Sequence, residues 1–256
     1  MWMHPTTLRN RAVIRISGTE ARPFLQGLLT QDVMSVAPGA PRWGALLTPQ
    51  GKALFDMMLW ADPDQPEDIL IDCEADRADL LIRRLSLYRL RRPVGIARED
   101  NLAVHWSPDA DAPGVPDPRL ATLGHRWLAP ATDGDAAPAF LLTRVKQSVL
   151  EGAAELGEDK TLWLETKAEE LNGVNYSKGC YIGQENTARM HYRNKVNRRL
   201  VALPIDQSDP ARQRHVYSEL GIAIDHRPVD KLAGLDLPDW LAQAIAEEPV
   251  TETPDA

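Results

Sequence analysis

Two apolar runs joined by only four residues constrain the fold of this chain most strongly. Residues 42–48 and 53–60 each have the length and composition of a strand, and Pro49-Gln-Gly-Lys52 connects them. Because proline and glycine favour tight turns, the segment predicts an antiparallel hairpin. Asp56 interrupts the second run, and a charged residue in a buried strand costs free energy unless it is paired or used. By alternation alone, Asp56 could equally face outward on a one-sided sheet.

The rest of the chain mixes helix and strand signals. Residues 11–17 alternate apolar and polar side chains, as a half-buried strand does. Further strands are expected at residues 69–71, 94–97, 102–106, 198–203 and 221–225, and helices at 20–29, 76–87, 140–156 and 184–192. Residues 108–138 contain six prolines and predict a loop-rich junction. The mixture predicts the α+β fold class.

Composition limits the kinds of partner. With 43% hydrophobic and 26% charged residues, the chain has the composition of an ordinary soluble protein. A net charge of −8 argues against general affinity for nucleic acid or an anionic membrane. No run of about 18 apolar residues occurs, and the N-terminus lacks a basic region followed by an apolar core. We therefore expect a cytoplasmic protein with no membrane partner.

The sequence holds only two cysteines, Cys73 and Cys180. Cys73 follows a strand-like run and is most simply a structural residue. Two thiols are too few for a zinc site or an iron–sulfur cluster held by this chain alone. No permanent metal is therefore expected, and any cluster ligated by Cys180 would be transient and shared with another molecule. The two cysteines could also pair, although their number fits a reducing compartment as well.

Cys180 lies in an unusual stretch, Tyr176-Ser-Lys-Gly-Cys-Tyr-Ile-Gly-Gln-Glu-Asn186. Gly179 and Gly183 allow sharp bends on both sides of the sulfur. Lys178 and the start of a helix at Gly183 both favour a thiolate, because each stabilises negative charge. A lone cysteine is often a small buried residue, but glycine, lysine and glutamate are poor core neighbours. The stretch predicts an exposed thiol that is reactive or binds metal.

The string Lys178-Gly-Cys-Tyr-Ile-Gly-Gln-Glu185 resembles the signature of the YgfZ/IBA57 family. Members of this family are folate-binding proteins related to the glycine-cleavage T-protein, and they are implicated in iron–sulfur cluster assembly or maintenance. The signature residues that support the match are Gly179, Tyr181, Gly183, Gln184 and Glu185. Other segments resemble the family in the same order from about residue 11 to residue 199.

The resemblance implies a T-protein-like composite of ferredoxin-like subdomains around a central folate cavity, followed by a small C-terminal β-barrel. Residues 1–194 would form the folate-binding region, with two interleaved subdomains and the loop-rich junction. Residues 195–245 would form a trimmed barrel. Residues 246–256 are acidic and are expected to be disordered.

The resemblance also implies residues that bind tetrahydrofolate or a related folate. Asp56 falls on the second position of the Asp-Asp pair that faces folate in the T-protein, and Phe55 replaces the first. Trp43 and Trp60 fall where the T-protein has aromatic folate contacts, and an aromatic wall would suit a flat pterin.

Two further positions belong to the implied pocket. Arg144 matches an arginine of the family, but Lys146 and Ser148 replace its glutamate and glycine, and a lysine donates where a carboxylate accepts. Glu165 falls on the glutamate of a segment that precedes the cysteine loop, with Leu164 in place of proline.

Three functions compete at this point. The first is a folate-binding accessory factor for the biogenesis or repair of iron–sulfur proteins, with Cys180 as the reactive atom and Lys178 as its electrostatic activator. Its partners would be iron–sulfur client or assembly proteins. The second is a tetrahydrofolate-dependent aminomethyltransferase or demethylase, which Asp56 favours but the cysteine motif does not. The third is an interaction module with a structural cysteine.

A basic cluster at residues 189–199 follows the loop. It would suit an acidic partner, a polyglutamyl folate tail or RNA. Nucleic acid is the weakest of these partners, because Tyr192 is the only aromatic residue available for stacking.

Overall fold

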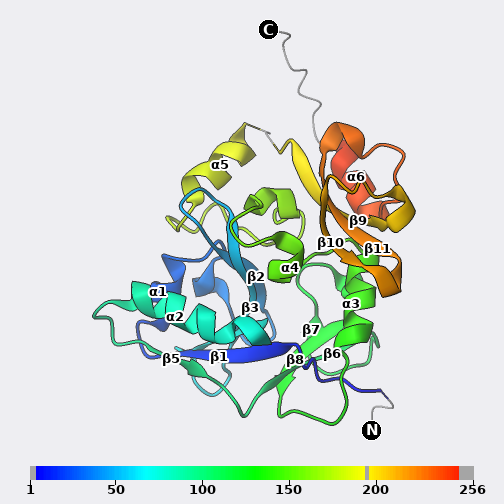
Figure 1. The fold of residues 1–256 in the computed structure, drawn as a ribbon. Coiled ribbons are helices and arrows are strands. Elements are labelled where there is room, and N and C mark those ends of the chain that lie inside the picture. The colour runs from blue at the N-terminus through cyan, green and yellow to red at the C-terminus, as the bar shows by residue number, and fades with distance from the viewer. Residues whose placement is uncertain (1–3, 194–195, 248–256) are drawn as a thin grey trace.

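A computed structural model describes residues 4–193 and 196–247, and its first half is built on a five-stranded antiparallel sheet of order β2-β3-β4-β1-β5 (Figure 1). Its strands are β1 (Arg11–Ser17), β2 (Arg42–Leu47), β3 (Ala53–Ala61), β4 (Ile69–Glu74) and β5 (Gly95–Arg98). The predicted hairpin is confirmed: β2 pairs with β3, and the amide of Thr48 donates to the carbonyl of Lys52 across the turn at 2.8 Å.

Helices cover one face of this sheet. α1 (Ala21–Gln26) and α2 (Ala78–Arg89) pack on the face that carries Phe55, Met57 and Leu59, three alternate residues of β3. The helix predicted over residues 20–29 is shorter than expected, because the chain leaves it at Gly27. The other face of the sheet is therefore free to meet the rest of the molecule.

The middle of the chain forms a second sheet and several helices. β6 (Ala103–Ser107), β7 (Val115–Pro116) and β8 (His125–Ala129) pair in the order β6-β8-β7. The helix predicted over residues 140–156 is wrong as one element. It divides into α3 (Ala137–Lys146) and α4 (Gly152–Leu156), because Ser148 and Gly152 both have positive φ.

α5 (Gln184–Tyr192) matches its prediction, and a third sheet completes the fold. β9 (Arg198–Pro204), β10 (Gln213–Tyr217) and β11 (Ile222–Pro228) pair in the order β10-β11-β9, with α6 (Asp239–Glu247) after them. Among the described residues these strands form an open sheet and not a closed barrel. Residues 248–256 of the predicted tail lie outside the described part of the chain.

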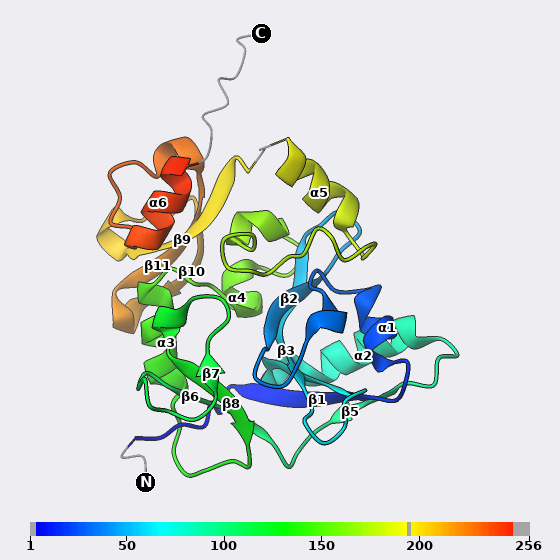
Figure 2. The ribbon, with the colours of Figure 1, turned by 180° about the vertical axis from the view of Figure 1, so that it is seen from behind.

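Short 3-10 turns connect the larger elements. They are Val33–Ser35, Ala75–Arg77, Ala121–Leu123, Trp163–Thr166, Ile205–Gln207, Ser218–Leu220 and Val229–Lys231. In both ribbon views α4 lies at the centre, between the three sheets (Figures 1 and 2). None of the helices in the described ranges is long and apolar enough to span a bilayer. The mixture of helices and antiparallel sheets agrees with the predicted α+β class.

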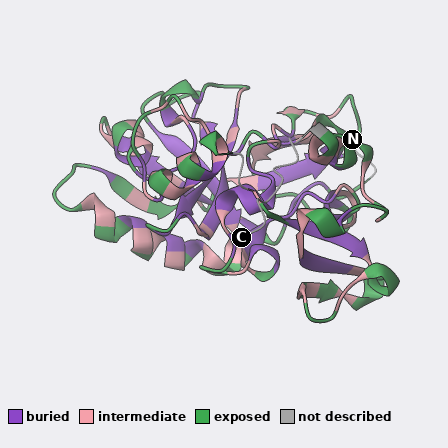
Figure 3. Cartoon of the chain, turned by 90° about the horizontal axis from the view of Figure 1, so that it is seen from above, coloured by how far each residue is buried: buried purple, intermediate pink, exposed green. Residues whose placement is uncertain are grey.

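Buried residues are concentrated on the strands and on the elements between the sheets (Figure 3). One core cluster contains Trp43 of β2, Val104 of β6, Phe140 of α3 and Leu200 of β9. Because these residues come from all three sheets and from α3, this cluster joins the sheets, while two further clusters lie between the first sheet and α1 and α2 and between the third sheet and α6.

Buried ion pairs cross this core. Strand alternation places Arg11 of β1 and Asp72 of β4 on the face turned away from α1 and α2. The Arg11 Nε donates to Asp72 Oδ1 at 2.6 Å, and Nη2 of Arg126 on β8 donates to Asp72 Oδ2 at 2.6 Å. Asp72 is fully buried and accepts from two arginines, so it joins the first sheet to the second.

The ion pairs continue toward α4. Asp117 accepts from Arg119 Nε and Nη2 at 2.9 and 2.8 Å, and Arg119 Nη1 donates to Glu151 Oε2 at 2.6 Å. Arg144 of α3 donates from both Nη atoms to Glu155 at 2.6 and 2.7 Å. The network holds as many arginines as carboxylates: Arg11, Arg119, Arg126 and Arg144 with Asp72, Asp117, Glu151 and Glu155.

We predict that Arg126→Leu destabilises the protein by about 3 kcal/mol or more, because removing one partner of a buried pair leaves uncompensated charge. Urea unfolding of the two proteins measures the difference. Arg92→Leu is the control, since Arg92 meets Glu20 at 3.9 Å on the surface and should contribute less than about 1 kcal/mol. Equal stability of Arg126→Leu and wild type would contradict a structural role for the network.

Candidate functional site

Cys180 lies on an exposed loop that precedes α5, and it is a free thiol, whereas Cys73 is buried. Gly179 and Gly183 have φ of +95° and +83°, the left-handed region that favours glycine. At Gly183 a Cβ atom would lie 2.5 Å from the carbonyl oxygen of Thr48. The loop therefore packs directly on the β2–β3 hairpin, and only glycine fits at that contact.

Lys178 anchors the same loop to α1. Its ammonium donates to the carbonyls of Gln26 and Leu29, the latter at 2.6 Å. In return, Gln26 Nε2 donates to the Lys178 carbonyl at 3.1 Å. These contacts hold the backbone two residues before Cys180 in a fixed position.

Burial and two neighbouring residues influence the pKa of Lys178. Burial lowers the pKa of Lys178 to about 8, while the negative charges of Asp32 and of the Cys180 thiolate act in the opposite direction. Lys178 is therefore close enough to interact with the sulfur electrostatically. Its contacts give it an anchoring role, and its activation of the thiol stays a prediction.

The remaining signature residues have structural roles. Tyr181 is buried in the shared core, and its ring lies 5.0 Å from the Lys178 Nζ. Gln184 begins α5. Glu185 accepts from Arg189 at 2.7 Å, one turn further along the helix, as the sequence spacing indicates. The signature therefore combines one exposed thiol with residues that fix its surroundings.

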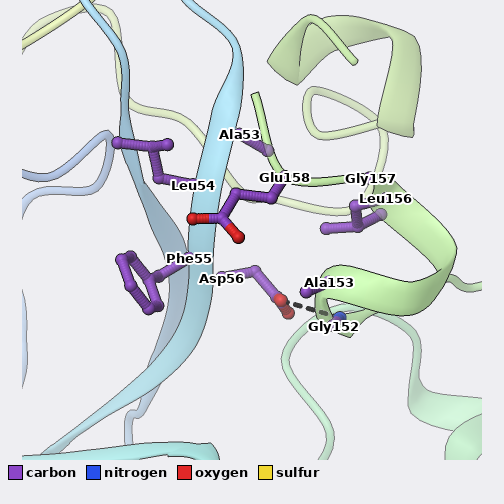
Figure 4. A pocket seen from close by; sticks show the side chains of 9 residues that line it. All are labelled: Ala53, Leu54, Phe55, Asp56, Gly152, Ala153, Leu156, Gly157 and Glu158. Carbon is purple, nitrogen blue, oxygen red and sulfur yellow. Dashed lines mark hydrogen bonds between the residues drawn. The ribbon is translucent and has the colours of Figure 1, made fainter. Parts of the chain in front are cut away.

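Asp56 is buried, and both of its carboxylate oxygens accept hydrogen bonds. Its Oδ2 accepts from Trp43 Nε1 at 3.2 Å, and its Oδ1 accepts from the amide of Gly152 at 2.8 Å. Figure 4 shows Asp56 pointing from β3 toward the start of α4. The void beside it measures about 10 Å³, about the space of one water molecule. Burial raises the pKa of Asp56, and the negative charge of Glu151 acts in the same direction.

The two tryptophans predicted to form an aromatic wall are both buried. Trp43 is 1% exposed, and its ring centroid lies 4.7 Å from that of Trp163. Trp60 is 8% exposed. Neither tryptophan lines the larger cavity described next. Both indole rings therefore lie in the apolar core between the sheets and line neither of the two cavities.

A larger cavity of about 330 Å³ opens between the start of β1, α3, α4 and β10. Its walls are formed by Asn10, Arg11, Glu74, Asp135, Ala137, Pro138, Leu141, Arg144, Glu151, Gly152, Ala154, Glu155 and Tyr217. The cavity thus carries charges of both signs, with an apolar wall from α3. It borders the buried ion-pair network.

Glu151 keeps unused hydrogen-bonding capacity at this cavity. Glu151 Oε1 lies 3.5 Å from Arg144 Nε and 3.7 Å from an Nη of Arg11, beyond good hydrogen-bond geometry. Arg144 Nε has no hydrogen-bond partner among the described residues. Glu155, in contrast, is saturated by Arg144, Tyr217 and the amide of Glu151. Glu151 Oε1 is therefore an acceptor at this cavity without a good hydrogen bond in the described part of the chain, whereas the unpartnered Arg144 Nε is itself buried.

The predicted folate residues lie in three places. Arg144 lines the cavity, whereas Asp56, Trp43 and Trp60 are buried and do not line it. Glu165 lies elsewhere: it accepts from the amide of Leu162 at 3.0 Å and meets His226 Nε2 of β11 at 3.2 Å. It ties the third sheet to the preceding 3-10 turn.

Sequence reasoning missed Arg11, Glu74, Glu151 and Tyr217 at the cavity. A signal was available for Arg11, because it is a charged residue that alternates with apolar ones in the strand predicted over residues 11–17. Lys146, whose replacement of glutamate raised doubt about the pocket, is exposed on α3 and does not line the cavity.

No family model matches the chain, but several curated relatives do. The iron-sulfur cluster assembly factor IBA57 of Mus musculus is 32% identical, covering 80% of this chain and 67% of its own length. This chain belongs to the IBA57 family. The human IBA57 protein is 32% identical (79% and 66% covered), and the Neurospora crassa homolog is 30% identical (77% and 52%). The chain thus spans about half to two thirds of these relatives.

A solved structure supports the fold. The glycine cleavage system aminomethyltransferase T from Bartonella henselae superposes with a TM-score of 0.62 at 13% identity, covering 88% of this chain and 78% of that one. The predicted T-protein-like fold is thereby confirmed.

The IBA57 relatives also correct one expectation. The matched proteins from Neurospora crassa, human, mouse and Pyricularia oryzae are all named as mitochondrial. The cytoplasmic location expected from the sequence is therefore wrong. Composition could not reveal this, because net charge and hydropathy do not distinguish two aqueous compartments.

We predict that Lys178→Met loosens the cysteine loop, because the carbonyls of Gln26 and Leu29 lose a charged donor. The stability should fall by about 1–3 kcal/mol, and amide exchange should accelerate at residues 176–183. Hydrogen-exchange mass spectrometry measures the local effect. Lys231→Met is the control, since Lys231 is exposed and meets Asp230 at 3.7 Å on the surface. Unchanged exchange in the loop would count against the anchoring role.

We predict a pH-dependent contribution to stability from Glu74. Burial raises its pKa from 4.5 to about 7, and the charge of Asp56 adds to the effect. The folded protein binds this proton more tightly than the unfolded chain, so the contribution is complete below about pH 4.5 and is lost as the pH rises through about 7.

The variant Glu74→Gln should lack this contribution. From pH 5 to pH 8, the free energy of unfolding of the wild type should fall by about 1–3 kcal/mol more than that of the variant. Urea unfolding at both pH values measures this difference. Glu67→Gln, a substitution on an exposed loop, serves as the control. A parallel pH dependence of wild type and Glu74→Gln would show that the carboxyl titrates normally.

Proposed function

We propose that this chain supports the assembly or repair of iron–sulfur proteins through the thiol of Cys180. The observation that carries the proposal is the position of this sulfur: it is exposed, while the loop around it is anchored to α1 and to the β2–β3 hairpin. The IBA57 relatives are named as iron–sulfur cluster assembly factors, which supports the same function.

The chemistry assigned to Cys180 is thiolate ligation of a cluster in transit. A thiolate is the usual protein ligand of iron in these clusters, and binding releases the thiol proton. The second cysteine, Cys73, is buried, and burial raises its pKa to about 12, so it does not serve as a ligand. Cys180 therefore supplies one ligand, and a partner protein supplies the others.

We further propose that the cavity beside α4 binds a folate. Its volume of about 330 Å³ lies at the lower end of the range for small-molecule sites, roughly 300–1,000 Å³. Glu151 Oε1 offers an acceptor without a good hydrogen bond of its own, which suits the amide and amine N–H groups of a pterin. The residues at the cavity thus fit the head of a folate.

Within this proposal, Arg144, Glu151 and Tyr217 would hold the folate. A bound tetrahydrofolate would supply a reduced ring that can carry one-carbon units. Trp43 and Trp60 are not part of the proposed site, because both are covered by neighbouring side chains.

The competing function, a folate-dependent aminomethyltransferase or demethylase, has less support. It depends on Asp56 as the carboxylate that meets the folate amine. Asp56 is 4% exposed, and both of its oxygens already accept hydrogen bonds from Trp43 and Gly152. A carboxylate in that position fixes the start of α4.

The role of Cys180 is tested by complementation. The host cells lack their own gene of the IBA57 family and express this chain instead. Cys180→Ala should reduce the activity of [4Fe–4S] dehydratases at least five-fold, to the level of the empty vector. Ser177→Ala, a change at an exposed position of the same loop, should keep wild-type activity. Full activity of Cys180→Ala would refute the proposed function.

The folate site is tested by anaerobic calorimetry with tetrahydrofolate and the full-length protein. Leu141→Trp places a large ring on the cavity wall and should weaken binding at least ten-fold. Lys146→Trp, an exposed position on the same helix, should bind as the wild type does. Lack of binding by the wild type, or equal binding by both variants, would exclude this cavity.

A further inference from the structure

Tyr192 is the last residue of α5 and is 74% exposed, one of the highest exposed fractions among the large apolar and aromatic side chains that the structure describes. The ring of His191 meets it edge-on, with centroids 4.9 Å apart and planes at 68°. α5 lies at the outer edge of the molecule in both ribbon views (Figures 1 and 2). An aromatic ring of this size is therefore presented outward and not toward the core.

The ring of Tyr192 rests on a rigid support. His191 stacks on Tyr176 with centroids 3.9 Å apart, and its Nδ1 lies 2.8 Å from Glu169 Oε1. The Tyr176 hydroxyl donates to the other oxygen of Glu169 at 3.0 Å. Burial and the charge of Glu169 raise the pKa of Tyr176, so the hydroxyl keeps its proton and this bond. An aromatic side chain held in place loses little conformational entropy on binding.

The same surface is basic in an acidic protein. Among the described residues 184–193 and 196–199, Arg199 is buried and pairs with Glu170, and Arg189 pairs with Glu185, which leaves Arg193 and Arg198 as excess positive charge in a chain whose net charge is −8. Arg189, Arg193 and Arg198 are exposed. Tyrosine and arginine are the residue types that most often dominate binding energy at protein interfaces. The local charge favours a partner with an acidic surface.

This surface lies beside Cys180. Tyr176, which supports the ring cluster, precedes Cys180 by four residues, a span of at most about 14 Å. α5 begins four residues after Cys180. The stack of Tyr176 on His191 therefore brings the end of α5 back to the start of the cysteine loop. A protein bound at Tyr192 is within reach of the sulfur.

We propose that Tyr192 and the arginines Arg189, Arg193 and Arg198 form a docking surface for an acidic protein that exchanges an iron–sulfur cluster with Cys180. This inference rests on the proposed function and adds the surface and the charge of the partner. The arginines attract and orient the partner, and Tyr192 packs against it. In the exchange one iron–thiolate bond of the partner breaks and one to Cys180 forms, and the freed partner thiolate takes up the proton that the Cys180 thiol loses, so no electron is transferred.

The surface is tested by charge reversal in the complementation system described above. Arg189→Glu combined with Arg193→Glu should lower [4Fe–4S] dehydratase activity at least five-fold, and Tyr192→Ala at least three-fold. Arg189→Lys with Arg193→Lys should retain most of the activity. Arg83→Glu with Arg91→Glu reverses the same charge on the exposed side of α2 and on the loop after it, and should have no effect.

A second measurement excludes indirect effects on the loop. The purified charge-reversal variant should match the wild type in melting temperature and in the alkylation rate of Cys180 by iodoacetamide. Cys180→Ala reports on the proposed function separately. If Cys180→Ala is inactive while charge reversal leaves the activity unchanged, the docking surface is refuted and the function of Cys180 is not.

The class of partner is tested by photo-crosslinking in cells. Benzoylphenylalanine at position 192 should capture a protein that is acidic and cysteine-containing when identified by mass spectrometry, and the same probe at Leu87 of α2 should not capture it. The purified captured protein should bind wild type at least ten-fold more tightly than the charge-reversal variant, with an affinity that falls as salt rises. Capture of RNA, or of no macromolecule, would overturn the proposal.

Discussion

The buried ion-pair network is the constraint on which the rest of this structure depends. Arg11 and Asp72 lie on neighbouring strands of the first sheet, Arg126 on the second sheet, and Arg144 on α3. Isolated charges at these depths would be strongly unfavourable, so each must find its counter-ion from another element. This requirement fixes how the sheets meet around α4. It acts together with the apolar core, which by itself is not directional.

The network also shapes the candidate ligand cavity. Glu151 belongs to both: one oxygen accepts from Arg119 in the core, and the other faces Arg11 and Arg144 without a good hydrogen bond. The cavity is thus polar because the network ends there. Asp56 and Trp43 do not line this cavity, and they pair with each other through a hydrogen bond from Trp43 Nε1.

The cysteine loop is organised by short-range contacts of a different kind. Gly183 packs on the hairpin turn, Lys178 holds the end of α1, and Tyr176 stacks on the last turn of α5. None of these contacts involves the ion-pair network. An exposed sulfur on an anchored loop, beside a basic and aromatic helix surface, suits reversible exchange with another protein. The cavity and the loop are therefore separate parts of the molecule, which allows their roles to be tested independently.

The sequence by itself determined the hairpin, α5 and the exposed cysteine loop, because each depends on residues close together in the chain. Proline and glycine set the turn at residues 49–52, and glycines on both sides of Cys180 keep it out of the core. Only the tertiary structure decided which side chains line the cavity and where Trp43 and Trp60 point. Those side chains come from distant elements, and their burial follows from packing and charge pairing that no local pattern records.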